Sequence, residues 1–168
     1  MAIHITNETD KTLSGKVKWK LIDFYGERLF ENIIDVEVPN YCSKKIDEII
    51  FKLDNYKKMN TVFYAQLIID DEVISENFIS FVPDKHLNLP KGNIMFKLEK
   101  RESTCTLTLK CEVFCKFVEI QLKHDDVIFS DNYFHLLPNI SKKITFESEK
   151  DIDSLLKDLQ IRSLIDTF

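Results

Sequence analysis

Carboxylates are the side chains of this sequence best suited to chemistry, because paired Asp and Glu residues act as acid, base or nucleophile in reactions such as glycoside hydrolysis. Such a pair needs to lie about 5–10 Å apart across a cleft. Two of the three acidic clusters fall at expected hairpin tips, where Asp is a common turn former. The third opens a stretch with helical spacing, where acids suit the helix dipole. We therefore expect no catalytic residue among Asp70-Asp71-Glu72, Asp125-Asp126, or Glu147, Glu149, Asp151 and Asp153.

Histidines and glycines offer no further site. The histidines have no metal-ligand spacing, and no serine occupies a Gly-x-Ser-x-Gly turn. Three glycines in the whole chain are too few for a phosphate-cradling loop. We expect neither a bound metal nor a cofactor. The histidines are His4, His86, His124 and His135.

The four cysteines are expected to be free thiols, most of them buried. Cys105, Cys111 and Cys115 crowd together while Cys42 stands apart, and no pair has the separation of a bridge between facing sheets. A disulfide framework or a zinc site are the less favoured alternatives, and there is no Cys-x-x-Cys. Free thiols and the absence of a visible signal peptide favour a cytoplasmic location.

Exposed aromatic residues could form a platform on which sugar rings stack. The candidates do not form a contiguous set, so packing in a core or along an edge is the favoured role for each. They are Tyr25, Tyr41, Tyr56 and Tyr133.

Composition places the chain among soluble globular proteins. With 44% hydrophobic and 30% charged residues, disorder is not expected. The net charge of −5, with signs interspersed, disfavours a nucleic-acid surface. No apolar run approaches the length of a membrane span. Partners from these two classes are therefore not expected.

The first half of the chain predicts a β-sandwich. Alternation is clearest over Gly15–Phe24, where Val17, Trp19 and Leu21 share one face and Trp19 is expected to lie against the facing sheet. Residues 44–53 fit a helical period as well as a strand, and we interpret them as a strand because their neighbours are β. The expected strands are 2–7, 15–24, 29–38, 44–53, 61–70 and 73–81.

A connector without periodicity separates this half from a second sandwich. Residues 82–92 contain two prolines and a glycine. We therefore predict an all-β protein with two tandem immunoglobulin-like sandwiches, residues 1–85 and 86–168. One short helix is expected near the C-terminus, over residues 148–159 with Ser148 as its cap. The strands expected in the second half are 94–100, 104–111, 117–123, 142–146 and 159–165.

The stretch from Val127 to Pro138 predicts a bent sheet edge. The polar hinge at residues 130–132 can bond its own backbone and turn the strand. Tyr133 and Phe134 should then point to opposite sides, one of them into the core. Pro138 has no N–H and ends the ladder.

The same stretch resembles a known family. Phe129–Phe134, followed by Leu136–Pro138 and Lys142–Phe146, is similar to the last domain of β-mannosidases of glycoside hydrolase family 2. Ile161–Phe168 is similar to the way those enzymes end. Residues 15–40 resemble the immunoglobulin-like domain that precedes the last one in the family. The resemblance covers essentially the whole chain.

This resemblance implies a non-catalytic, C-terminal accessory region of a β-mannosidase-like enzyme that hydrolyses terminal β-D-mannosyl residues. In the family, acid and nucleophile belong to a separate (β/α) barrel, and no residue of this chain matches those motifs. The barrel of the parent chain and a second subunit are the implied partners, and substrate is reached only through the parent. An autonomous carbohydrate-binding or adhesion module is the alternative, and an enzyme in its own right is a third.

Overall fold

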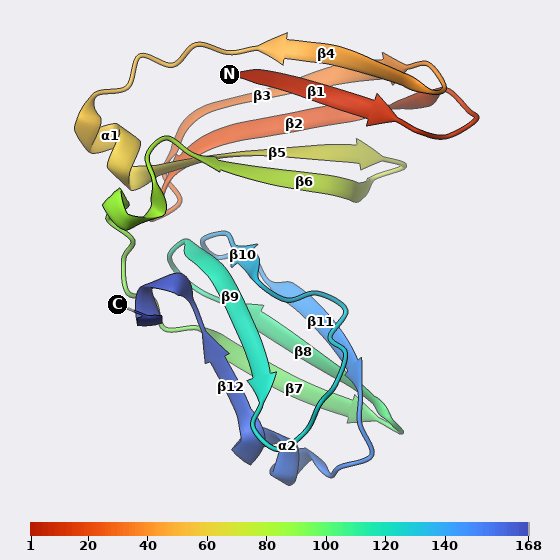
Figure 1. The fold of residues 1–168 in the computed structure, drawn as a ribbon, viewed down its shortest axis with the longest axis vertical. Coiled ribbons are helices and arrows are strands. Elements are labelled where there is room, and N and C mark those ends of the chain that lie inside the picture. Colours follow the sequence, from red (N-terminus) through yellow and green to blue (C-terminus); the bar gives the residue numbers. More distant parts are fainter. Residues whose placement is uncertain (168) are drawn as a thin grey trace. The chain divides into compact units, whose positions relative to one another are not determined.

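The computed structural model describes residues 1–167, and strands dominate it (Figure 1). The chain divides into two compact units. The first comprises residues 1–23 and 27–87, and the second comprises residues 24–26 together with the chain from residue 88 onward. Phe168, the last residue of the C-terminal motif, lies outside the described residues. No helix in the described part is long and apolar enough to cross a membrane. The all-β class is confirmed.

The first unit is a β-sandwich made of antiparallel sheets. Its strands are β1 (Ala2–Asn7), β2 (Leu13–Asp23), β3 (Arg28–Val38), β4 (Cys42–Glu48), β5 (Thr61–Ile69) and β6 (Glu72–Ser80). A four-stranded sheet has the order β3-β2-β5-β6, and β1 pairs with β4 in a two-stranded sheet. Side chains alternate between faces along a strand, so Val17 and Leu21 on β2 are buried, whereas Lys16, directly before Val17, is exposed.

Trp19 connects the two sheets of the first unit. Its indole Nε1–H on β2 donates to a carboxylate oxygen of Asp47 on β4, at 3.1 Å. Its ring lies 5.7 Å from the ring of Phe63 on β5, between ring centroids. A buried indole needs a partner for its N–H, and Asp47 provides one. The predicted position of Trp19 against the facing sheet is confirmed.

The prediction of one strand over residues 44–53 is wrong in its second half. β4 ends at Glu48, and the chain continues without regular structure until helix α1 (Asn55–Asn60), which the sequence analysis missed. Asp54 caps this helix, because its carboxylate accepts the backbone N–H of Lys57 at 2.8 Å. Asp54 therefore sets the start of this helix.

The second unit is also a β-sandwich. Its strands are β7 (Met95–Arg101), β8 (Thr104–Lys110), β9 (Cys115–Leu122), β10 (Phe134–Leu136), β11 (Lys142–Glu147) and β12 (Leu159–Arg162). They form two three-stranded sheets with the orders β10-β9-β12 and β11-β8-β7. The core lies between them and takes alternate side chains of the two central strands, such as Leu107 and Leu109 from β8 and Val118 and Ile120 from β9.

The C-terminal helix is shorter than predicted. Helix α2 (Ile152–Asp158) begins after Asp151, so Ser148 is not its cap. The Asp151 carboxylate accepts the backbone N–H of Ser154 at 2.9 Å and its hydroxyl at 2.8 Å. Asp is a strong N-cap and lies directly before the helix, so it sets the first turn.

The last strand also ends earlier than predicted. β12 stops at Arg162, and residues 164–167 form a 3-10 turn, η2, in place of the strand expected to continue to residue 165. Asp166 explains the turn, because its carboxylate accepts both the backbone N–H of Ser163 at 2.8 Å and its hydroxyl at 2.9 Å. These two local hydrogen bonds compete with further pairing of β12 with β9.

The polar hinge binds neighbouring strands more than its own backbone. Ser130 Oγ accepts the backbone N–H of Thr145 on β11 at 2.9 Å. The Asp131 carboxylate forms an ion pair with Lys142 Nζ, also on β11, at 2.8 Å. The side-chain oxygen of Asn132 instead accepts the backbone N–H of Ile120 on β9, which belongs to the other sheet. The hinge therefore connects one sheet of the second unit to the other, which differs from the predicted role.

The aromatic pair after the hinge behaves as predicted. Tyr133 is 61% exposed, whereas Phe134 is 6% exposed and belongs to the core. Lys142 Nζ lies 4.9 Å from the centroid of the Phe134 ring and adds a cation–π contact at the edge of the core.

Candidate functional site

The acidic clusters occupy loops and helix ends. Asp70 and Asp71 form the β5–β6 turn of the first unit, with φ of 50° and 63°, a conformation that Asp tolerates better than most residues. Asp125 and Asp126 lie in the loop after β9 in the second unit. Glu147 ends β11, where hydrogen bonds from Ser103 and Thr104 lower the pKa of its carboxyl. Asp70, Asp71 and Glu147 thus have local structural roles.

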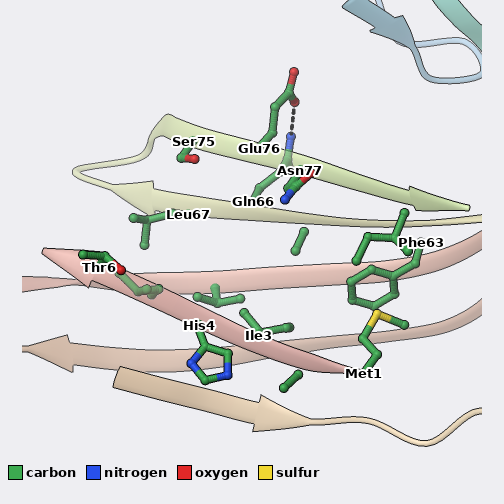
Figure 2. Close-up of a pocket in the computed structure, with 15 residues that line it drawn as sticks. Met1, Ile3, His4, Thr6, Phe63, Gln66, Leu67, Ser75, Glu76 and Asn77 are labelled. Carbon is green, nitrogen blue, oxygen red and sulfur yellow. Dashed lines mark hydrogen bonds between the residues drawn. The ribbon is translucent and has the colours of Figure 1, made fainter. Parts of the chain in front are cut away.

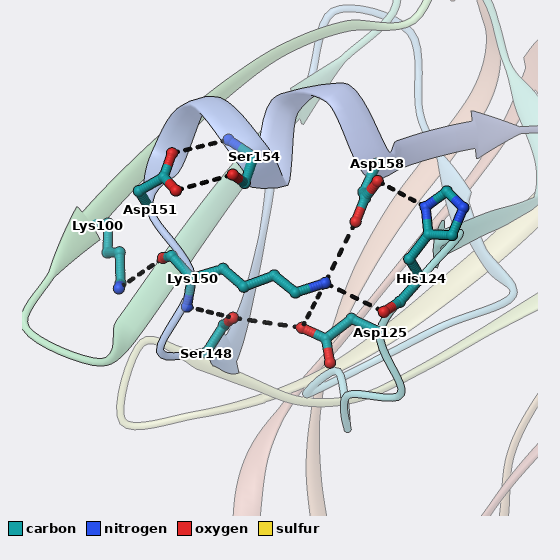
Figure 3. Close-up of polar contacts among 8 residues, drawn as sticks. All are labelled: Lys100, His124, Asp125, Ser148, Lys150, Asp151, Ser154 and Asp158. Atoms are coloured by element: carbon teal, nitrogen blue, oxygen red, sulfur yellow. Dashed lines mark hydrogen bonds and ion pairs between the residues drawn. The ribbon is translucent and has the colours of Figure 1, made fainter.

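Two carboxylates converge around the ammonium group of Lys150 (Figure 3). Lys150 Nζ lies 3.3 Å from a carboxylate oxygen of Asp158 and 3.6 Å from one of Asp125. It also donates to the backbone carbonyl of His124 at 3.1 Å. This cluster, called the Lys150 cluster below, brings together the loop after β9, the segment before α2 and the end of α2.

His124 completes the Lys150 cluster from the solvent side. Its Nδ1 lies 2.9 Å from the second carboxylate oxygen of Asp158, and its side chain is largely exposed. The hydrogen bond to His124, followed by that from Lys150, lowers the pKa of Asp158. Asp158 therefore stays ionised at neutral pH and is a poor proton donor. Because the lysine ammonium fills the space between the two carboxylates, a sugar ring cannot enter there.

The other histidines lie on separate elements. His4 is exposed on β1, and His86 is exposed in the 3-10 turn η1 (Asp84–His86). His135 on β10 accepts the backbone N–H of Phe117 through Nδ1 at 3.1 Å. Among the described residues, no group of three or more His, Cys, Asp and Glu side chains could hold a metal ion.

The four candidate tyrosines are exposed and lie on different elements. Tyr25 and Tyr41 occupy the turns at the two ends of β3, and Tyr56 belongs to α1. Tyr133 has a polar contact, because its hydroxyl donates to Glu119 at 3.0 Å and this bond raises its pKa. The structure thus places the candidate platform residues on four separate segments.

The cysteines divide into one exposed and three buried free thiols, all within the described residues. Cys111 and Cys115 lie beside Gly92, where a Cβ atom would come within 2.5 Å of the first Sγ and 3.4 Å of the second. Burial is the main cause that raises the pKa of Cys115, and burial also raises the pKa of Cys105. The raised pKa values and the burial suit packing more than thiolate chemistry.

The first unit contains an open groove between β1 and β6 (Figure 2). Its volume is about 250 Å³. Apolar side chains from β5, among them Phe63, Ala65 and Leu67, line it together with Val17 from β2. The polar side chains of Ser75, Gln66, Glu76 and Asn77 also line it.

Sequence reasoning missed both the Lys150 cluster and the groove. The cluster has no sequence signal, because its members come from segments that only the fold brings together. The groove, in contrast, does have a signal in the sequence. Alternation along 73–81 puts the polar Ser75 and Asn77 on the side of the strand that should face a core, and such residues indicate an uncovered position.

Fold and side-chain arrangement together define a class: a tandem pair of immunoglobulin-like sandwiches whose acidic residues serve turns, caps and ion pairs. The chain belongs to the family of mannosidase Ig/CBM-like domains, whose model matches residues 1–86. The model of an Ig-fold domain of mannosidases matches residues 89–167. The resemblance to the C-terminal immunoglobulin-like domains of a glycoside hydrolase family 2 β-mannosidase is confirmed.

Solved structures share the fold. A β-D-mannosidase from Dictyoglomus thermophilum superposes with a TM-score of 0.84 at 21% identity, over 97% of this chain and 20% of its own. An exo-chitosanase from Amycolatopsis orientalis superposes with a TM-score of 0.68 at 15% identity, over 96% of this chain and 24% of its own. The chain thus spans about a fifth to a quarter of the length of these glycosidases. No curated protein matches the sequence.

Proposed function

We propose that this chain is the non-catalytic, C-terminal accessory region of a β-mannosidase-like glycoside hydrolase. The parent enzyme would hydrolyse terminal β-D-mannosyl residues with retention. The observation that carries the proposal is the tandem order of two mannosidase-type domains, matched over residues 1–86 and 89–167. We place the boundary at residue 85, giving domains 1–85 and 86–168. The separation of the two compact units after Leu87 supports this boundary.

The chemistry of the chain supports a structural role. Retaining hydrolysis needs two carboxyl groups about 5 Å apart with the substrate between them. Where Asp125 and Asp158 converge, Lys150 occupies the intervening space and pairs with both. In this proposal the acid and the nucleophile belong to the barrel of the parent enzyme, and this chain contributes no catalytic, cofactor-binding or metal-binding residue.

The partner in this proposal is the catalytic barrel of the parent chain, with a second subunit as a further partner. Large apolar side chains at sheet edges support a docking role, since exposed apolar surface commonly marks interfaces. Met95 and Phe96 are exposed on β7, and Phe30 and Ile33 are exposed on β3. A cytoplasmic location is proposed for the parent, because four free thiols suit a reducing compartment.

Two assays on the isolated chain and one on the parent test the proposal. The chain is expected to leave an aryl β-mannoside unhydrolysed above background and to show no saturable binding of mannobiose. A parent enzyme truncated to its N-terminal part and barrel should regain activity when the chain is supplied in trans. Recovery of activity would support the accessory role.

Each alternative gives a different result in these assays. Turnover by the isolated chain that is lost in Asp125→Asn or Asp70→Asn would establish an enzyme. Saturable binding without turnover, lost in Tyr56→Ala or Tyr41→Ala, would establish a carbohydrate-binding module. Tyr133→Phe serves as the matched control, because it removes one hydroxyl and keeps an aromatic ring at the surface.

A further inference from the structure

One strand of the first unit has its core-facing side uncovered. On β6, Ser75 pairs with Leu67, Asn77 with Ala65, and Ile79 with Phe63. Paired residues of an antiparallel ladder lie on the same face of the sheet. Phe63, Ala65 and Leu67 belong to or pack against the core. Ser75, Asn77 and Ile79 therefore lie on the core side, yet all three are exposed, Ile79 by 40%.

The core-facing side of β6 is exposed because the two sheets of the first unit differ in size. A four-stranded sheet faces only β1 and β4, whereas the seven-stranded immunoglobulin sandwich pairs four strands with three. Within the described residues, β1 has β4 as its single strand partner, so its other edge is unpaired. The groove lies between this edge and β6, and both strands line it (Figure 2).

We propose that the groove is the seat of an extended polypeptide strand that adds to the free edge of β1. The strand would bring the small sheet to three strands and cover the uncovered side of β6. Its backbone would pair with β1, and alternate side chains would point toward Ala65 and Leu67. Because the groove has a volume of only about 250 Å³, small aliphatic residues such as Val or Ala suit these inward positions.

The polar residues of the groove fit a polypeptide backbone. Ser75 and Asn77 carry hydroxyl and amide groups, which can bond the peptide groups of a strand along its second edge. Sugar binding is disfavoured, because no Tyr or Trp is among the residues lining the groove. A second folded copy is disfavoured as well, because an edge strand that is part of a sandwich has one face on its own core.

The source of the strand is the rest of the glycosidase polypeptide, and this part of the inference depends on the proposed function. The solved glycosidases with this fold carry most of their chain outside the matched region, since the match covers 20% and 24% of them. A strand from the same polypeptide is held at high effective concentration, so few contacts suffice. It would also fasten the accessory region to the catalytic part.

The test supplies a strand to the complete 168-residue chain. A segment of alternating Thr and Val, about eight residues long, is fused before Met1 through an Asn-Gly turn, which favours a two-residue hairpin. The matched control has the same length with Pro at the Val positions, because Pro has no N–H for the ladder. Both carry Cys42→Ser and Ile79→Cys, so that the new thiol reports on the groove, which Ile79 also lines.

The strand fusion is expected to slow hydrogen exchange of the β1 amides and the labelling of Ile79→Cys, each by about tenfold or more relative to the proline control. Equal rates in the two fusions would overturn the inference. Protection in the unfused chain by mannobiose, or protection that rises with protein concentration, would overturn it in favour of a sugar or a second copy. The parent enzyme is absent from this test, so a negative result leaves the accessory role to the complementation assay.

Discussion

The side-chain amide of Asn132 takes the place of a strand beside Ile120. Its Nδ2 donates to the Ile120 carbonyl at 2.9 Å, and its Oδ1 accepts the Ile120 N–H at 2.8 Å. On this edge of β9 the ladder with β10 reaches only Val118. Because Ile120 is buried, both of its backbone groups need a partner, and one asparagine provides both.

Replacing this amide should destabilise the second unit. Asn132→Ala leaves the N–H and C=O of Ile120 without their partner, at a cost of about 1–3 kcal/mol for each group that water does not reach. Urea unfolding followed by near-UV absorbance or fluorescence gives the midpoints. Lys123→Ala, an exposed substitution, should change the free energy of unfolding by less than about 0.5 kcal/mol. Identical midpoints for the two variants would contradict the role of Asn132.

The aromatic pair that follows the hinge offers an internal comparison. Phe134→Ala should lower the free energy of unfolding by about 3–5 kcal/mol, because it empties a core position. Tyr133→Phe, one residue earlier, removes only the hydroxyl that donates to Glu119 and should lower the free energy of unfolding far less, because Tyr133 is exposed. A larger loss in Tyr133→Phe would mean that the hydroxyl network, and not the core, supports this stretch.

The Lys150 cluster predicts a dependence of stability on acid pH. The pKa of Asp158 is lower in the folded than in the unfolded chain, first because of the hydrogen bond with His124. The stabilisation is therefore fully present above the unfolded pKa of about 3.9 and is lost as the pH falls through the folded value. Urea midpoints of the native chain and of Asp158→Asn should differ at pH 7 and converge toward pH 3.

Asp126→Asn is the control, because Asp126 lies in the same loop as Asp125 but not in the cluster. Its effect on the midpoint should be small at pH 7. If the difference in urea midpoint between Asp158→Asn and the native chain stayed constant down to pH 3, the charge of Asp158 would not be the cause of the difference.

Thiol chemistry should separate Cys42 from the other cysteines. In the native protein one thiol should react rapidly, since Cys42 is exposed while Cys105, Cys111 and Cys115 are buried. The rapid phase should disappear in Cys42→Ser. After denaturation without reductant, four thiols should titrate in the native sequence. Fewer than three would mean that a disulfide forms in the protein.

The proposed domain boundary can be tested by limited proteolysis. Trypsin should cut first at Lys85 or Lys91, because both side chains are exposed in the connector and little regular structure protects the backbone there. Two stable fragments of similar mass should appear on a denaturing gel. First cleavage inside a strand such as β5, with the connector intact, would count against the boundary.

Local alternation predicted much of the fold, because burial of one strand face leaves a direct trace in the sequence. The alternate residues Val17, Trp19 and Leu21 are all buried, as are Val118, Ile120 and Leu122. Element ends were less predictable. Asp54 and Asp151 cap helices through bonds that depend on backbone conformation, so the apolar pattern alone misses α1 and starts α2 too early.

Contacts between distant segments could not be predicted from one sequence. Lys150 binds Asp125 through the fold, and nothing in the spacing of these residues indicates it. The polar hinge shows the same limit, since Ser130 and Asn132 suggested a local turn and instead bind two different strands. The number of strands in each sheet is likewise a property of pairing, which periodicity does not encode.

The pairing of β1 with β4 has a consequence for how the first unit folds. β2 with β3, and β5 with β6, are hairpins of adjacent strands, whereas Ala2 on β1 pairs with Glu48 on β4, with β2 and β3 between them in the sequence. Closing long loops costs entropy before contacts compensate for it, so pairings of low contact order form first. The β2–β3 and β5–β6 hairpins should therefore form first, and the pairing of β2 with β5, which joins Lys16 to Ile68, should follow late, as should that of β1 with β4. Until then the apolar faces of the two hairpins are exposed, which makes the partly folded chain prone to aggregation.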